Sequence, residues 1–226
     1  MDIRDESMST SRIVVGVDVG SHGKGFHAVG LQDDAYLDRF TARDPRSLTR
    51  WCLEIKARVV AIDAPCRWSV TGRARPAERE LAKEGIYAFA TPTRQGAESR
   101  AFYRWMQNGI ALYEAIEPHY QLFDGRTRNL GQVCFETFPH AVACALAGKI
   151  VSATQKRIIR RELLREAGID TRRLTNIDTI DAALCALAAN HFLAGNVKTY
   201  GDASEGFIVV PGYCIRKRES VSGSRD

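Results

Sequence analysis

Short apolar runs that end on an acidic residue recur along the chain. In the first run, residues 13–20, β-branched residues alternate with Gly16, Asp18 and Gly20. A strand here would carry its apolar side chains on one face and Asp18 on the other. Burying a lone carboxylate is costly, so an acid at the end of such a strand needs a cation, hydrogen-bond donors or a turn that it caps itself.

The remaining apolar patterns predict an α/β protein. Strands are predicted at 13–20, 25–31, 35–40, 59–65, 133–139 and 207–210. Helices are predicted at 45–56, 75–84, 97–116, 140–147, 155–167 and 176–194. Three strands joined by short turns form an antiparallel meander, and the later strands follow helices long enough to be crossovers. The order predicts a five-stranded mixed sheet, three antiparallel strands and then two parallel ones, with helices on both faces.

One domain is predicted over 13–211, preceded by a disordered leader at 1–12 and followed by a polar tail at 212–226. Between the fourth and fifth strands, about residues 66–120, lies a helical insertion that is rich in arginine. Its longer helix, 97–116, has an apolar stripe that includes Phe102, Trp105 and Met106, and this stripe is interpreted as core. The arginines then form a solvated face, with a nucleic-acid surface as the alternative.

Charge and composition narrow the function classes. The formal net charge is +5 and the sequence pI is about 9.0, which favours acidic partners such as nucleic acid. No apolar run approaches the ~18 residues of a membrane helix, and the N-terminal residues lack a signal-peptide core. The six cysteines have no zinc-binding spacing and mostly fall in apolar segments, so we expect them to be reduced in a cytoplasmic protein.

Five acidic residues are the candidate site. Asp18, Asp63 and Glu136 come at or near the ends of three predicted strands, and Asp178 and Asp181 lie three apart on the last helix. In open α/β sheets, ligands gather at the carboxyl ends of the parallel strands. Carboxylates that meet there raise one another's pKa unless cations compensate them. Mg²⁺ or Mn²⁺ suits such oxygen ligands, and two ions can activate water and stabilise the leaving oxygen of a phosphodiester.

These motifs resemble the RNase H-like nuclease superfamily. The resemblance is carried by Val15-Gly16-Val17-Asp18-Val19-Gly20, Ala61-Ile62-Asp63-Ala64-Pro65 and the Asp178-x-x-Asp181 helix. The layout is most similar to the branch that contains the Holliday-junction resolvases. A closer similarity is to the domain-of-unknown-function family 429, predicted nucleases of this fold. It adds Glu136-Thr137-Phe138-Pro139, Lys156 with Arg160, and Tyr200-Gly201-Asp202 through Glu205-Gly206 to Pro211.

The resemblance implies roles for individual residues. Asp18 would bridge two metal ions, and Asp63 with Asp178 or Asp181 would complete their coordination. Asp63 stands where the resolvase pattern usually has glutamate, one methylene longer. Glu136 is extra to that layout, and we predict it as a further catalytic acid, with a hydrogen-bond anchor or a structural role as alternatives. The predicted substrate contacts are Lys24, Arg94, Lys156 and Arg160.

Two other function classes remain open at this stage. The sequence Asp18-Val19-Gly20 with its glycine turn also suits an actin- or hexokinase-like phosphotransferase or ATPase. That family places a nucleotide between two such domains, so this chain would need a homodimer. A catalytically silent binding module is the third class. It predicts that the acids do not converge, or that arginines of residues 67–104 neutralise them.

Overall fold

The computed structural model describes residues 12–21, 23–126 and 131–212. The predicted leader and tail lie outside these ranges, apart from Arg12 and Gly212. The strands are β1 (Ile13–Val19), β2 (Phe26–Gln32), β3 (Ala35–Ala42), β4 (Val59–Asp63), β5 (Gln121–Leu122), β6 (Val133–Glu136), β7 (Val197–Asp202) and β8 (Gly206–Pro211). The α-helices are α1 (Pro45–Glu54), α2 (Pro76–Lys83), α3 (Arg94–Glu98), α4 (Arg104–Ile116), α5 (Pro139–Ala147), α6 (Lys156–Glu166) and α7 (Ile177–Leu193). Two 3₁₀ turns span Ala101–Tyr103 and Thr171–Arg173.

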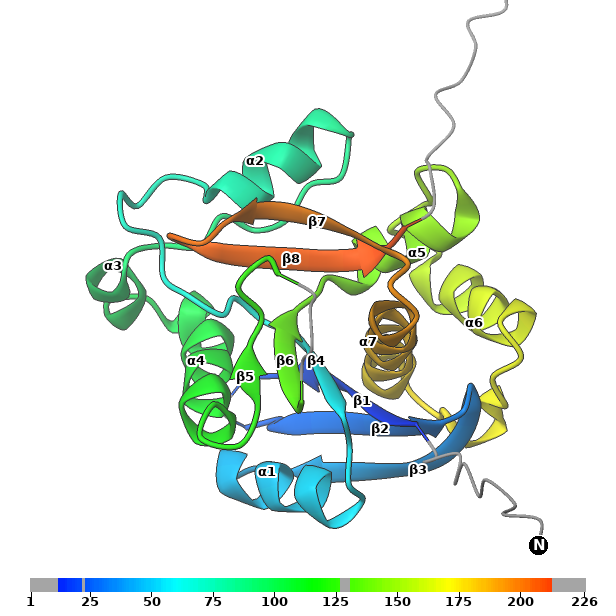
Figure 1. The fold of residues 1–226 in the computed structure, drawn as a ribbon. Coiled ribbons are helices and arrows are strands. Elements are labelled where there is room, and N and C mark those ends of the chain that lie inside the picture. Colours follow the sequence, from blue (N-terminus) through cyan, green and yellow to red (C-terminus); the bar gives the residue numbers. More distant parts are fainter. Residues whose placement is uncertain (1–11, 22, 127–130, 213–226) are drawn as a thin grey trace, which may run out of the picture.

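The predicted sheet is present, with β1 as an interior strand between β2 and β4. Its strand order is β3-β2-β1-β4-β6-β8-β7, with β5 paired beside β6 (Figure 1). The three N-terminal strands are antiparallel, and β1, β4 and β6 are parallel neighbours. The first five strands of this order are therefore the RNase H-like arrangement that the sequence predicted.

The strand count is higher than the predicted five. Within the described residues the sheet has eight strands, because β5 and β8 each add in parallel to β6 and β7 pairs antiparallel with β8. The sequence indicated a strand at 207–210 but not β7. Only Tyr200 of β7 is buried, so the strand lacks the apolar alternation on which the prediction depends.

Helices cover both faces of the sheet, as predicted (Figure 1). On one face, Val14, Val59 and Ala61 pack in a core cluster with side chains of α5 and α7. On the other, Val15 and Val17 belong to a second cluster with side chains of α1 and α4. Asp18 and Asp63 continue the alternation of Val14 and Ala61, so the pleat places them on the face that α7 covers.

The contact between β1 and α7 depends on Gly16. A Cβ atom at Gly16 would lie 2.0 Å from the carbonyl oxygen of Ala182 and 2.0 Å from the amide nitrogen of Ala186. Only a glycine lets the strand and the helix backbones approach so closely. This approach fixes the N-terminal turns of α7, which carry two of the candidate acids, relative to the end of β1.

The helical insertion lies between β4 and β5 and contains α2, α3 and α4. The helix predicted over 97–116 is interrupted, because Arg100 has an extended backbone and the helix restarts at Arg104. Met106 is buried as predicted, but Phe102 falls in the 3₁₀ turn before α4 and is 54% exposed. The interpretation of Phe102 as core is therefore wrong. Within the described ranges, no helix has the length and apolar character to cross a bilayer.

Candidate active site

Asp18 and Asp63 lie side by side at the carboxyl ends of two parallel strands. They are register partners in the β1–β4 ladder, which confirms their predicted adjacency. Both side chains are partly exposed. Neither forms an ion pair with a Lys or Arg among residues 12–21, 23–126 and 131–212. The two carboxyl groups therefore share one site without a directly paired cation, and Lys24, Lys156 and Arg160 act on them only from a greater distance.

Four of the predicted acids lie near enough to influence one another's charge. Burial, followed by the charges of Asp181 and Asp178, raises the pKa of Asp18 to about 8. Burial and the charges of Asp18 and Asp181 raise the pKa of Asp63 well above its usual range. Like charges act on each other in this way only at short range, especially in a site with limited access to water. A cation bound beside Asp18 and Asp63 would favour their ionised forms.

The two acids of α7 have different surroundings. Asp178, in the first turn, is partly exposed, and its oxygens lie 3.9 Å from Lys24 Nζ and 3.7 Å from His27 Nε2. Asp181 is buried and accepts a hydrogen bond from Nη1 of Arg160, with which it forms an ion pair. Burial raises the pKa of Asp181, and Arg160 opposes the rise. Asp178 thus lies at the exposed edge of the site, whereas Asp181 is bound by Arg160 of α6.

Glu136 is part of a buried ion-pair network. Its oxygens accept hydrogen bonds from Nη1 of Arg75 at 2.9 Å, from Nη2 of Arg75 at 2.5 Å and from the backbone N–H of Cys66 at 2.9 Å. Arg75 is 1% exposed and also donates to Glu78 and to the carbonyl oxygen of Glu205. Burial would lower the pKa of Arg75, but the two carboxylates raise it overall. These contacts favour the structural alternative for Glu136 over the predicted catalytic role, because its oxygens already have donors.

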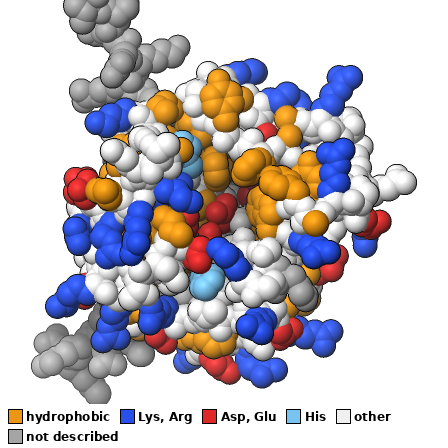
Figure 2. Space-filling view, turned by 180° about the vertical axis from the view of Figure 1, so that it is seen from behind, with side chains coloured by type: hydrophobic (Ala, Val, Ile, Leu, Met, Phe, Trp, Pro, Cys, Tyr) orange, Lys and Arg blue, Asp and Glu red, His pale blue; other side chains and the backbone are white. Residues whose placement is uncertain are grey.

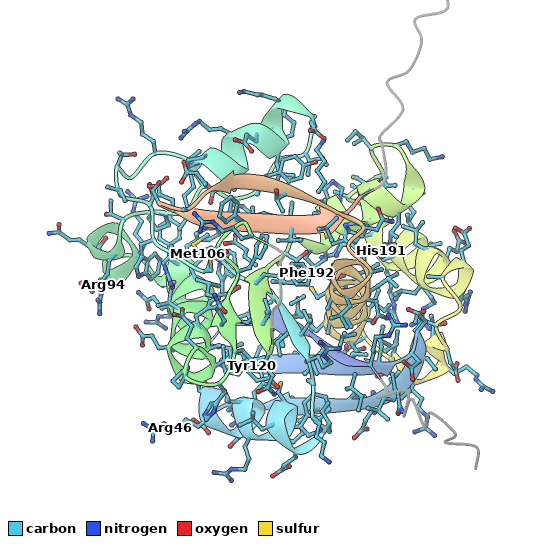
Figure 3. The ribbon with its side chains drawn as sticks, in the orientation of Figure 1. Arg46, Arg94, Met106, Tyr120, His191 and Phe192 are labelled. Carbon is cyan, nitrogen blue, oxygen red and sulfur yellow. The ribbon has the colours of Figure 1, made fainter. Side chains whose placement is uncertain are left out.

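The four predicted substrate contacts separate into three kinds. Lys24 and Lys156 are exposed and lie near enough to the acids to lower the pKa of Asp18. Arg160 is 6% exposed and forms an ion pair with Asp181, so it is not available to bind a phosphate in this arrangement. Arg94 lies on α3, extends away from the body of the molecule (Figure 3) and is 3.7 Å from Glu98. Figure 2 shows acidic side chains at the centre of one face, with basic side chains to one side and hydrophobic ones to the other.

Sequence reasoning missed three residues near the acids. His27 is the register partner of Asp18 on β2, and counting back across the predicted meander would have indicated it. Arg75 was read as one of many insertion arginines, and nothing local in the sequence distinguishes it. Trp105, predicted as core, is half-buried and lines a pocket together with Asp63 and Phe89.

The acidic site meets the needs of a divalent ion only in part. Asp18 and Asp63 offer hard oxygen donors without a competing cation, and Mg²⁺ is commonly held by one or two carboxylates with water and substrate phosphates. In this arrangement, however, no three His, Cys, Asp or Glu side chains of the described residues form a group that could hold a metal. The site therefore fits one ion held by two carboxylates, and not a complete two-ion cage.

Comparison with known proteins gives a family and a structural neighbour. A family model described as "Protein of unknown function (DUF429)" matches residues 16–205. A solved structure described as "Thermus thermophilus RuvC structure" is 15% identical, with a TM-score of 0.44. The similarity covers 81% of this chain and 96% of that one. No curated protein matches the sequence.

Proposed function

The chain belongs to the DUF429 family of proteins of unknown function, and from that premise we propose that it is a divalent-metal-dependent phosphodiesterase that cleaves nucleic acid. The observation that carries the proposal is the Asp18–Asp63 pair. Two adjacent carboxyl groups at the carboxyl ends of parallel strands, without a Lys or Arg partner in the described part of the chain, are costly to the fold. A bound cation would offset this cost.

The residues are assigned as follows. Asp18 and Asp63 would hold Mg²⁺ or Mn²⁺, and the ion, when bound, would supply Lewis-acid activation of the phosphodiester and its attacking water. Asp178, at the exposed edge of the site, would orient water through one of its oxygens. Lys24 and Lys156 would contact phosphate groups of the substrate, as their exposure and charge allow. The net charge of +5 supports an anionic polymer as partner, and buried free cysteines suit the cytoplasm.

Arg160 limits the number of ions in this proposal. The resemblance to the resolvases implies two ions, and a second ion would need an oxygen of Asp181. In the present arrangement Arg160 occupies that carboxylate. We therefore propose one ion between Asp18 and Asp63, with a second only after Arg160 releases Asp181.

The test is cleavage of a substrate panel in Mg²⁺ or Mn²⁺. Single-stranded, duplex and branched DNA and RNA are incubated with the protein, with Asp18→Asn and with Asp63→Asn. Asp44→Asn is the matched control, because Asp44 is the N-cap of α1, where asparagine also caps well. We expect metal-dependent cleavage that both site variants lose and the control keeps. No cleavage by the wild-type protein with any member of the panel would overturn the proposal, and ATP turnover instead would favour the phosphotransferase.

One observation favours a second candidate, a binding module without catalysis. Two of the five predicted acids are already neutralised by arginine: Asp181 by Arg160 and Glu136 by Arg75. Such a module would bind nucleic acid with the same affinity in EDTA and in Mg²⁺. It would also keep that affinity in Asp63→Asn, whereas the enzyme should bind substrate more tightly with the metal.

A further inference from the structure

A group of aromatic side chains is exposed on the helical insertion. Phe89 is 66% exposed and Phe102 is 54% exposed. Their rings meet edge to face with centroids 5.3 Å apart, and the ring of Tyr103 meets that of Phe102 in the same way at 5.1 Å. Burying a phenylalanine side chain is favourable, so exposed rings that touch each other leave apolar surface that a binding partner could cover. Such a patch commonly marks a binding surface.

The aromatic patch, defined as Phe89, Phe102 and Tyr103, is continuous with the acidic site. Phe89 and Trp105 line the pocket that also contains Asp63. The helix that follows the patch is held against the ends of both acid-bearing strands. Asn108 Nδ2 of α4 donates to the carbonyl oxygen of Gly20 at 3.1 Å, beyond the end of β1. A Cβ atom at Gly109 would lie 2.3 Å from the Cβ atom of Ala64, the residue after β4.

Exposed arginines surround the patch. Arg100 and Arg104 flank Phe102 and Tyr103 in the sequence, and both are exposed. Arg94, whose side chain is 76% exposed, extends from α3 nearby (Figure 3). An aromatic surface with cations along it complements one ligand chemistry in particular: flat nucleobases joined by phosphates. Paired bases keep their faces stacked inside a duplex and cannot use such a surface.

We propose that the aromatic patch stacks unpaired nucleobases while the neighbouring arginines contact the phosphates of the same strand. The substrate of the acidic site is then a nucleic acid with a single-stranded segment. This inference rests on the proposed function for the chemistry of the adjacent site. The binding step itself needs only the patch and the arginines.

Binding is measured by fluorescence anisotropy in EDTA, so that no cleavage can occur. The probes are a labelled oligothymidine and a labelled oligouridine of about 20 nucleotides, and a duplex of the same length. Stacking contributes about 1–3 kcal/mol per base, so Phe102→Ala should raise the Kd for single strands about 5- to 150-fold. Phe102→Trp should keep the affinity, because a ring remains. Val70→Ala, a change at an aliphatic residue of the insertion that is 74% exposed, is the matched control and should change nothing.

Three results would overturn the inference. The first is equal affinity of the wild-type protein for single strands and duplex. The second is an unchanged Kd in Phe102→Ala together with a loss of binding in Arg104→Ala, which would leave the aromatic rings without a role. The third is concentration-dependent self-association of the wild-type protein that Phe102→Ala removes, because the patch would then bind a second copy of the chain.

The same experiment separates this inference from the proposed function. If the protein binds single strands through Phe102 but cleaves no substrate, the stacking role of the aromatic patch is supported and the proposed phosphodiesterase activity is overturned. If Phe102→Ala changes neither binding nor metal-dependent cleavage, the phosphodiesterase activity is supported and the stacking role of the aromatic patch is overturned.

Discussion

Replacing Gly16 by alanine should separate β1 from α7 and disturb the site at the end of both. The new Cβ atom would lie 2.0 Å from backbone atoms of Ala182 and Ala186, and 2.7 Å from the carbonyl carbon of Cys185. None of these is the end of a flexible side chain, so either the strand or the helix must move. The helix carries Asp178 and Asp181 two turns or less from the point of contact, and a shift there moves both acids relative to Asp18.

The size of the effect follows from the contact. Inserting a methyl group into a packed interior typically costs about 1–3 kcal/mol. Because the new methyl group would meet rigid backbone, we expect Gly16→Ala to lower the free energy of unfolding by an amount at the upper end of this range, about 3 kcal/mol. For a chain of this length, 1 kcal/mol corresponds to about 2–4 °C in Tm, so we expect a loss of about 6–12 °C. Activity in the cleavage assay should fall at temperatures where the variant is still folded.

Thermal and urea unfolding of three proteins measures this prediction. The matched control is Gly30→Ala, in the neighbouring strand β2, where the new Cβ atom meets Ile55 Cδ1 at 3.4 Å, Trp51 at 3.6 Å and the carbonyl oxygen of Asp38 at 3.8 Å, all ordinary contact distances. Both positions are buried in the sheet, and they differ in how closely the neighbouring backbone approaches the new Cβ atom. A Tm for Gly16→Ala equal to that of Gly30→Ala would refute the reasoning that the strand–helix distance is fixed by the glycine.

Three further predictions concern the charges. Arg75→Met leaves Glu136 and Glu78 buried without their cation, so urea unfolding should show a loss of about 3–5 kcal/mol, against less than about 0.5 kcal/mol for the exposed Arg94→Met. In EDTA, the wild-type protein should lose stability as the pH rises from about 4 to about 8. Because the pKa of Asp18 is raised to about 8, the folded state binds the proton more tightly than the unfolded state in that window. Asp18→Asn should flatten the profile, and an unchanged slope would contradict the account. Finally, Mg²⁺ at about 100 times its Kd should stabilise the wild-type protein by about 2.7 kcal/mol in a melting assay, and equal stabilisation of Asp18→Asn would place the ion elsewhere.

Much of the fold could be predicted from local patterns. The N-cap Asp44 with Pro45, the left-handed Gly85 and Gly148 after their helices, and the alternation of residues 13–19 act through neighbouring backbone, so the sequence displays them directly. Phe102 was misplaced because one residue with extended backbone, Arg100, breaks the helical period. A periodic pattern does not reveal such a break.

For the acids of the site, too, local features could be predicted from the sequence and distant contacts could not. Their positions at strand ends were visible, because β-branched runs that end on Asp18 and Asp63 are local features. Their partners were not. Arg160 and Asp181 are 21 residues apart, and Arg75 and Glu136 are 61 apart. Basic residues are frequent in this chain, and the sequence around an arginine that becomes buried does not differ from that around an arginine that stays in solvent.

The sequence by itself determined most of the strands and helices and where along them the carboxylates lie, because propensity and periodicity depend on residues close in the chain. Only the tertiary structure decided which carboxyl groups lack a directly paired cation and which form an ion pair with an arginine. It also decided which aromatic rings remain in contact with solvent. These outcomes depend on distances between elements, and the close approach at Gly16 and the placement of α4 set those distances.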